Sequence, residues 1–190
     1  MEIERRFLNV AELRVSRADD KPSKISGYAA RFNVLSEDMG GFREKIKPGA
    51  FGKSLSGGAD VRALVNHDPN LVIGRNTAGT LKVTENKTGL KVSITPPDTQ
   101  AGRDIVTSIE RGDIDGMSFG FRTVSDSWAR VKDEEIRTLE EVELHDVSAV
   151  TYPAYTDTSV AVRSLDAHKE TIKPKLETLK MRLELTEAAM

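Results

Sequence analysis

The feature that most constrains the fold is a series of short apolar segments separated by turn-forming residues. LVIGRN, GTLKVTE and GLKVSIT follow one another, with turn signals at Thr77–Gly79 and Asn86–Gly89 between them. Closely spaced short strands with Gly and Asn turns are typical of small barrels and sandwiches. The same pattern predicts strands within 4–17, 25–34, 61–70, 116–131, 137–155 and 159–165. The sequence therefore predicts a mainly β domain with a few helices.

Two helices and a loop interrupt these strands. The stretch QAGRDIVTSIERG has an apolar stripe and ends in Gly, and either Asp98 or Thr99 can cap its start. A short helix ended by glycines is predicted within 51–58. Residues 36–51 are rich in Gly and Pro, so we expect a long surface loop there. In a compact domain, a loop of this length is often functional.

The C-terminal segment has a different character from the rest. Apolar residues recur with many charges between them at Leu176, Leu179, Leu183 and Leu185. This spacing predicts an amphipathic helix. We therefore expect a domain over 1–165 and a helical tail over 166–190. The tail is interpreted either as a solvated helix or as an assembly or tethering segment.

The composition argues against several classes of site. There is no cysteine, which excludes disulfides, thiolate zinc sites and cysteine nucleophiles, and the three histidines include no pair four residues apart. The 28 Lys and Arg residues nearly balance the 30 Asp and Glu residues, so the chain has no general attraction for nucleic acid or anionic membranes. No apolar run is long enough to span a bilayer, and the N-terminal residues lack a signal-peptide core. We expect no metal, cofactor, nucleic-acid partner or membrane, and action where the protein is made.

Two residues stand where a hydrolase would place a base and a nucleophile. His67 ends the apolar segment ALVNHDPN, and strand ends that open into loops often carry catalytic groups. Ser118 lies in DGMSFGF between Gly116 and Gly120, and such glycines let another backbone, such as a peptide substrate, approach closely. The residues alone also fit a turn histidine and an ordinary strand serine.

A third group would come from the segment EEVELHDVSAVTYPAY. His145 and Asp146 are adjacent, so on a strand they point to opposite faces and only one can share a site with Ser118. A neutral imidazole removes the proton of an attacking serine, and a third group orients that imidazole. The chain order would be His, Ser, then acid. Because there is no G-x-S-x-G motif, an α/β-hydrolase is disfavoured.

Four longer runs resemble the prohead maturation serine proteases of tailed bacteriophages. They are YAARFNVLSEDMGGFREKIKPGAF, DVRALVNHDPNLVIGR, DTQAGRDIVTSIERGDIDGMSFGF and LHDVSAVTYPAYTDTSVAVRS. The likeness covers residues 1–165 in the family's order. That family is similar to the herpesvirus capsid maturation protease, assemblin. The resemblance implies a closed, mostly antiparallel β-barrel with a few helices, and serine-protease chemistry.

The resemblance also implies roles for individual residues. The family's histidine falls on His67 and its serine falls on Ser118. The acid that precedes Val-Ser falls on Asp146, but assemblin uses a second histidine, which makes His145 the alternative third member. Backbone amides or the guanidinium of Arg75 are candidates for holding the oxyanion, and a surface ion pair is the alternative for Arg75.

For the whole protein, the resemblance implies a serine endopeptidase that acts inside the assembling prohead, in the cytoplasm of the bacterial host. Its substrates would be scaffold or the scaffolding segment of the major capsid protein, together with the protease itself. Self-association is left open. The alternative function is a capsid assembly factor that binds capsid protein without cutting it.

Overall fold

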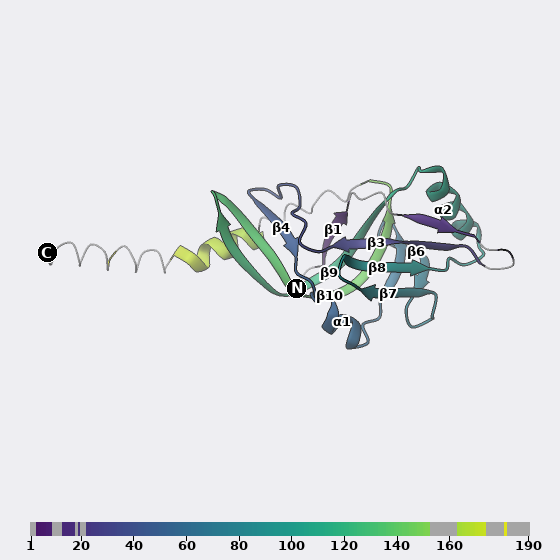
Figure 1. The fold of residues 1–190 in the computed structure, drawn as a ribbon, viewed down its shortest axis with the longest axis horizontal. Helices are drawn as coiled ribbons and strands as arrows, with labels where there is room; N and C mark the ends of the chain where they lie inside the picture. The colour runs from purple at the N-terminus through teal and green to yellow at the C-terminus, as the bar shows by residue number, and fades with distance from the viewer. Residues whose placement is uncertain are drawn as a thin grey trace.

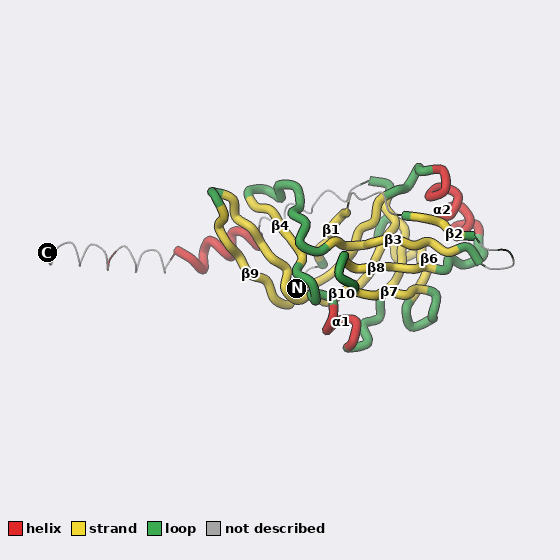
Figure 2. The backbone as a smooth tube through the Cα atoms, viewed as in Figure 1, coloured by secondary structure: helices red, strands yellow, loops and turns green. Residues whose placement is uncertain are grey.

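The computed structural model describes residues 3–8, 13–17, 19, 22–152, 163–173 and 181. Strands dominate and a few helices accompany them, as predicted (Figures 1 and 2). In chain order the elements are β1 (Glu4–Leu8), β2 (Arg14–Ser16), β3 (Lys24–Arg31), β4 (Phe42–Ile46), α1 (Gly52–Ser56), β5 (Arg62–Val65), β6 (Asp68–Arg75), β7 (Leu81–Glu85), β8 (Gly89–Ile94), α2 (Gln100–Arg111), β9 (Gly116–Val131) and β10 (Glu134–Val150). Another helical segment covers residues 163–173.

The described strands form two sheets, and β10 is central to the larger one. That sheet has the order β1-β9-β10-β5-β6, and β4 also pairs with β10. One edge of β10 pairs with β9 in an antiparallel ladder, and its other edge pairs in parallel first with β4 and then with β5. The smaller sheet has the order β2-β3-β8-β7 and is antiparallel. Strands from distant parts of the sequence therefore meet on β10.

The structure does not support the predicted closed antiparallel barrel. Among the described residues, β1 and β6 are the edges of one open sheet, and β2 and β7 are the edges of the other. An isolated parallel bridge between Phe32 and Ile46 joins the end of β3 to β4 of the other sheet. The two sheets also pack closely near Gly74, where an added Cβ would lie 3.0 Å from Ile94 Cγ2 and 3.1 Å from the carbonyl oxygen of Thr80. The pairing is also mixed, because β4 and β5 run parallel to β10.

The main hydrophobic core contains buried side chains from both sheets and from α2. Phe119 stacks on Phe121 with 5.0 Å between ring centroids, and Phe51 meets Phe119 edge-on at 5.5 Å. Met117, Phe119 and Phe121 are alternate residues of β9, and all three belong to this core. Side chains alternate along a strand, so Ser118 lies on the opposite face of β9.

The two helices predicted within 51–58 and 100–112 are confirmed, and two other predictions are partly wrong. Thr99 caps α2, since its Oγ1 accepts a hydrogen bond from the Gly102 N–H at 3.2 Å. The predicted loop over 36–51 contains β4, whose alternate residues are buried. In the predicted strand 159–165, the last three residues are helical and the others lie outside the described residues. The leucines of the predicted tail helix also lie outside them.

The outer part of the β9–β10 hairpin projects away from the body beside β4 (Figure 1). Trp128 on this projection contacts the Phe42 ring at 5.0 Å and stacks on His168 of helix 163–173 at 4.7 Å. Leu165 of the same helix is buried in a small second core with Phe42. The predicted domain boundary after Leu165 therefore falls inside a helix that packs on the hairpin.

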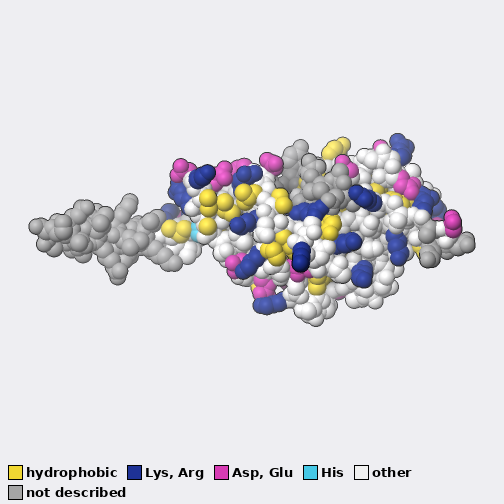
Figure 3. All heavy atoms as spheres, in the orientation of Figure 1, with side chains coloured by type: hydrophobic (Ala, Val, Ile, Leu, Met, Phe, Trp, Pro, Cys, Tyr) yellow, Lys and Arg dark blue, Asp and Glu magenta, His cyan; other side chains and the backbone are white. Residues whose placement is uncertain are grey.

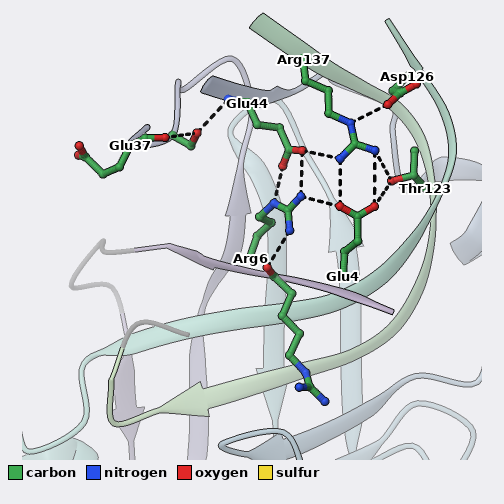
Figure 4. Close-up of polar contacts among 9 residues, drawn as sticks. Glu4, Arg6, Glu37, Glu44, Thr123, Asp126 and Arg137 are labelled. Atoms are coloured by element: carbon green, nitrogen blue, oxygen red, sulfur yellow. Dashed lines mark hydrogen bonds and ion pairs between the residues drawn. The ribbon is translucent and has the colours of Figure 1, made fainter. Parts of the chain in front are cut away.

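Buried charges connect β1, β4 and β10 beside this hairpin (Figure 4). Arg6 donates hydrogen bonds to Glu44 Oε1 at 2.7 Å and to Glu4 Oε2 at 2.6 Å. Arg137 Nη1 donates to both glutamates at 3.0 Å, and its Nε donates to Asp126 at 2.6 Å. Neither the hydrophobic pattern nor the resemblance predicted this cluster.

The cluster also makes stability depend on pH. Burial alone would raise the pKa of Glu4, but the charges of Arg6 and Arg137 outweigh it and hold this pKa below its ordinary value. A carboxyl group with a lowered pKa stabilises the fold when it is ionised. The contribution of Glu4 is therefore present at neutral pH and is lost as the pH falls through its lowered pKa.

Removing the Arg137 charge is expected to destabilise the fold strongly. Arg137→Met would leave Glu4 and Glu44 buried with one cation fewer, and breaking a buried ion pair typically costs about 3–5 kcal/mol. Urea unfolding measures this loss. The matched control is Arg130→Met on the same hairpin, because Arg130 is exposed and its ion pair with Asp133 should contribute about 1 kcal/mol or less. Equal losses in the two variants would contradict this account of the cluster.

Acidic and basic side chains both occur across the face of the molecule in Figure 3. This mixture agrees with the nearly balanced charge of the chain. Within the described part of the chain, no helix has the length and apolar character required to cross a bilayer.

Candidate active site

His67 lies in the turn of the β5–β6 hairpin. Val65 pairs with Asp68, which leaves Asn66 and His67 as a two-residue loop with positive φ angles of 51° and 57°. Positive φ at both loop residues is typical of a type I′ turn, where Gly is commonly the second residue. A histidine there adopts a less favoured backbone conformation, and such positions often carry function.

Asn66 attaches this turn to the end of β10. Its backbone N–H donates to the Ala149 carbonyl at 2.9 Å. Its side-chain Oδ1 accepts from the Thr151 N–H at 2.9 Å, and its Nδ2 donates to Thr151 Oγ1 at 3.2 Å. These bonds hold the His67 turn against the strand that carries Asp146.

A bulge in β10 sets the direction of Asp146. Leu144 pairs with Phe121 and Asp146 pairs with Gly120, so His145 is an extra residue between the two pairs. In an unbroken strand, Leu144 and Asp146 would share a face. The bulge reverses the alternation, so Leu144 enters the core while Asp146 lies on the same face as Ser118.

The structure brings His67, Ser118 and Asp146 together in one hydrogen-bonded series. His67 Nδ1 lies 2.6 Å from Asp146 Oδ1, and His67 Nε2 lies 2.6 Å from Ser118 Oγ. Ser118 is completely buried, and the side chains of His67 and Asp146 are 5% and 14% exposed. The imidazole thus bridges the hydroxyl and the carboxylate through its two ring nitrogens, in surroundings with little water.

The glycines on either side of Ser118 make room for side chains of the protein itself. A Cβ on Gly120 would lie 2.3 Å from Asp146 Oδ2, and a Cβ on Gly116 would lie 2.3 Å from the ring of Phe7. The close approach predicted for these glycines therefore exists, but its partners are the carboxylate and an aromatic ring of β1. Because residue 120 has no side chain, the Asp146 carboxylate has room to lie against β9.

The other two candidate residues have different surroundings. His145 has its Nε2 buried with no hydrogen-bond partner, and Glu143 Oε2 is 3.9 Å away. Arg75 lies at the far end of the β5–β6 hairpin from the His67 turn, where its Nε and Nη2 bind Asp60 at 2.7 Å and 2.6 Å. This hydrogen bonding lowers the pKa of Asp60 to about 2. Arg75 thus forms the surface ion pair that was the alternative to an oxyanion role.

The sequence analysis missed Ser148, whose Oγ lies 2.9 Å from Asp146 Oδ1 and 3.2 Å from His67 Nδ1. The spacing could have found it, because residues two apart on a strand share a face. Within the described residues, no group of three His, Cys, Asp or Glu side chains is placed to hold a metal ion.

A serine, a histidine and an acid in hydrogen-bonded series are the arrangement that serine hydrolases use. The sequence matches the family described as caudovirus prohead serine protease over residues 11–172, which is most of the chain. The protein therefore belongs to this family of serine proteases.

One solved structure similar to this chain is that of the bacteriophage T4 capsid assembly protease, gp21. The TM-score is 0.51 at 12% sequence identity, and the match covers 80% of this chain and all of the other. At this identity the likeness concerns the fold. The comparison with curated proteins found no match.

Proposed function

We propose that the protein is a serine endopeptidase that cleaves scaffold, or the scaffolding segment of the major capsid protein, and also itself, inside the assembling prohead. The observation that carries this proposal is the series Ser118–His67–Asp146, with 2.6 Å at each hydrogen bond. Membership of the prohead serine protease family supports the class of substrate. The name of the structural neighbour, a capsid assembly protease, agrees with it.

The geometry is suited to general-base catalysis at Ser118. As Oγ attacks the substrate carbonyl carbon, its proton passes to His67 Nε2 and the carbonyl becomes a tetrahedral oxyanion. His67 then gives that proton to the leaving amine, and the C–N bond breaks to leave an ester on Ser118. Water, deprotonated by the same imidazole, then attacks the ester; the C–O bond to Ser118 breaks, and the imidazole returns the proton to Ser118 Oγ. Asp146 holds the ring and stabilises its charged form.

The burial of the nucleophile adds a condition to this mechanism. Ser118 is 0% exposed, so a peptide carbonyl reaches its Oγ only when the surroundings open locally. While the site is closed it excludes water, so the hydrogen bonds around His67 are not weakened by solvent. We therefore include local opening by the substrate in the proposed reaction.

Coexpression with the cognate capsid protein and scaffold tests the proposal. Intact-mass measurement should find truncated capsid or scaffold products, and shortened protease, with the wild-type chain. The same products should be absent with Ser118→Ala, which removes the nucleophile. Truncated products that persist with Ser118→Ala would exclude Ser118 as the nucleophile. Capsid assembly without any cleavage by the wild type would favour an assembly factor instead.

A further inference from the structure

Ser148 is a buried polar residue that the mechanism above does not use. It lies directly opposite Ser118 in the β9–β10 ladder and is 0% exposed. Its Oγ, Asp146 Oδ1 and His67 Nδ1 form a close triangle, with 2.9 Å from Oγ to Oδ1, 3.2 Å from Oγ to Nδ1 and 2.6 Å from Nδ1 to Oδ1. A hydroxyl in this position contacts both the Asp146 carboxylate and the His67 ring that the carboxylate orients.

The available protons determine which group donates in this triangle. An ionised carboxylate only accepts hydrogen bonds, so Asp146 Oδ1 must receive one from the Ser148 hydroxyl and one from His67 Nδ1–H. With its proton on Nδ1, the neutral imidazole has an unprotonated Nε2. That nitrogen is then the acceptor for the hydroxyl of Ser118.

We propose that Ser148 is a positioning residue of the site: its hydroxyl holds the Asp146 carboxylate, and through it the tautomer and orientation of His67. The proposal rests on the proposed function and adds a fourth member to the series. A carboxylate with one oxygen held by two donors has less freedom to rotate away from the ring. Hydrogen bonds to charged groups are also stronger than those between neutral groups.

The backbone supports this role independently of the side-chain contacts. Ser148 follows Asp146 by two residues, so the pleat places both on one face. β5 pairs with β10 on the other side, where Leu64 lies opposite Ser148. Because β9 and β5 both pair with β10 at Ser148, the backbone that carries the hydroxyl is held on both sides.

The test compares Ser148→Ala with a matched control, using cleavage of a capsid-derived peptide. Loss of a hydrogen bond to the ionised Asp146 should lower kcat about tenfold, while KM stays unchanged. The control is Ser127→Ala, because Ser127 on the same hairpin donates to the Glu140 carboxylate at 3.1 Å on the surface. Ser127→Ala should retain wild-type kcat. A wild-type kcat for Ser148→Ala would overturn the proposal.

A second arm separates positioning through Asp146 from a general structural effect. In an Asp146→Ala background there is no carboxylate to hold, so adding Ser148→Ala should change kcat no further. The same tenfold loss in both backgrounds would overturn the proposal. Thermal unfolding of each variant shows whether a lost activity reflects a lost fold.

The final measurement needs no activity. In the Ser118→Ala protein, the proton on His67 Nδ1 should give a downfield NMR resonance, and adding Ser148→Ala should move or broaden it. An unchanged resonance would contradict the proposed contact.

The outcomes also separate the two proposals. Cleavage by Ser118→Ala would overturn the proposed function, whereas an inactive Ser118→Ala beside a fully active Ser148→Ala would overturn only this inference.

Discussion

Replacing Ser118 or His67 with Ala is expected to lower kcat by about a million-fold, and replacing both should lower it no further. The two side chains act as one unit, because the hydroxyl is a weak nucleophile without the imidazole and the imidazole has no proton to take without the hydroxyl. Their separation of 2.6 Å already places the proton between them. Such groups show strong non-additivity when they are removed together.

Steady-state cleavage of a peptide that spans a scaffold site measures these losses. The informative quantity is kcat of the double variant divided by kcat of each single variant, because the absolute size of the residual rate cancels in this ratio. Losses that multiply in the double variant would mean that the two residues serve separate steps. His168→Ala is a suitable histidine control, because its ring stacks on Trp128 in the projecting hairpin.

Asp146→Asn is expected to lower kcat about ten-thousand-fold, which is the effect of this change in a well-studied serine protease triad. The amide has nearly the same shape as the carboxylate but can donate a hydrogen bond to His67 Nδ1. The ring proton then moves to Nε2, which can no longer accept the proton of Ser118. KM should change little, because neither the carboxylate nor the amide at position 146 needs to contact the rest of the substrate.

Two other variants test the assignment of Asp146. His145→Ala should keep kcat near that of the wild type, since the described contact of His145 is with Glu143. Gly120→Ala should lower kcat about a hundred-fold without altering the carboxylate chemically, because its Cβ would lie 2.3 Å from Asp146 Oδ2 and displace it. If only His145→Ala abolished cleavage, the third member would be His145.

The candidate site was predictable from the sequence to different extents for its three members. His67 and Ser118 carry local signals, a strand end and a pair of glycines, and the resemblance selected them from other residues of the same kind. Asp146 and His145 could not be separated from the residues alone. The choice depends on the bulge at His145, and strand alternation by itself does not reveal an extra residue.

The limits of the fold prediction have the same physical origin. Short strands and the α2 helix are local features, so turn residues and an apolar stripe identified them. Sheet closure and the parallel pairing of β4 depend on contacts between distant segments, which a local pattern does not contain. The cluster around Arg137 is a clear case, because its glutamates at positions 4 and 44 are far away in the chain.

His145 is the extra residue that creates the bulge in β10. Position 145 therefore has to be occupied by a residue, whereas the chemistry of its side chain is not constrained in the same way. Deleting that residue would exchange the two faces of the strand beyond it, turning Asp146 and Ser148 toward the hydrophobic interior and Val147 toward Ser118. Relatives that share this site are therefore expected to tolerate many amino acids at this position but no change in the number of residues between Leu144 and Asp146.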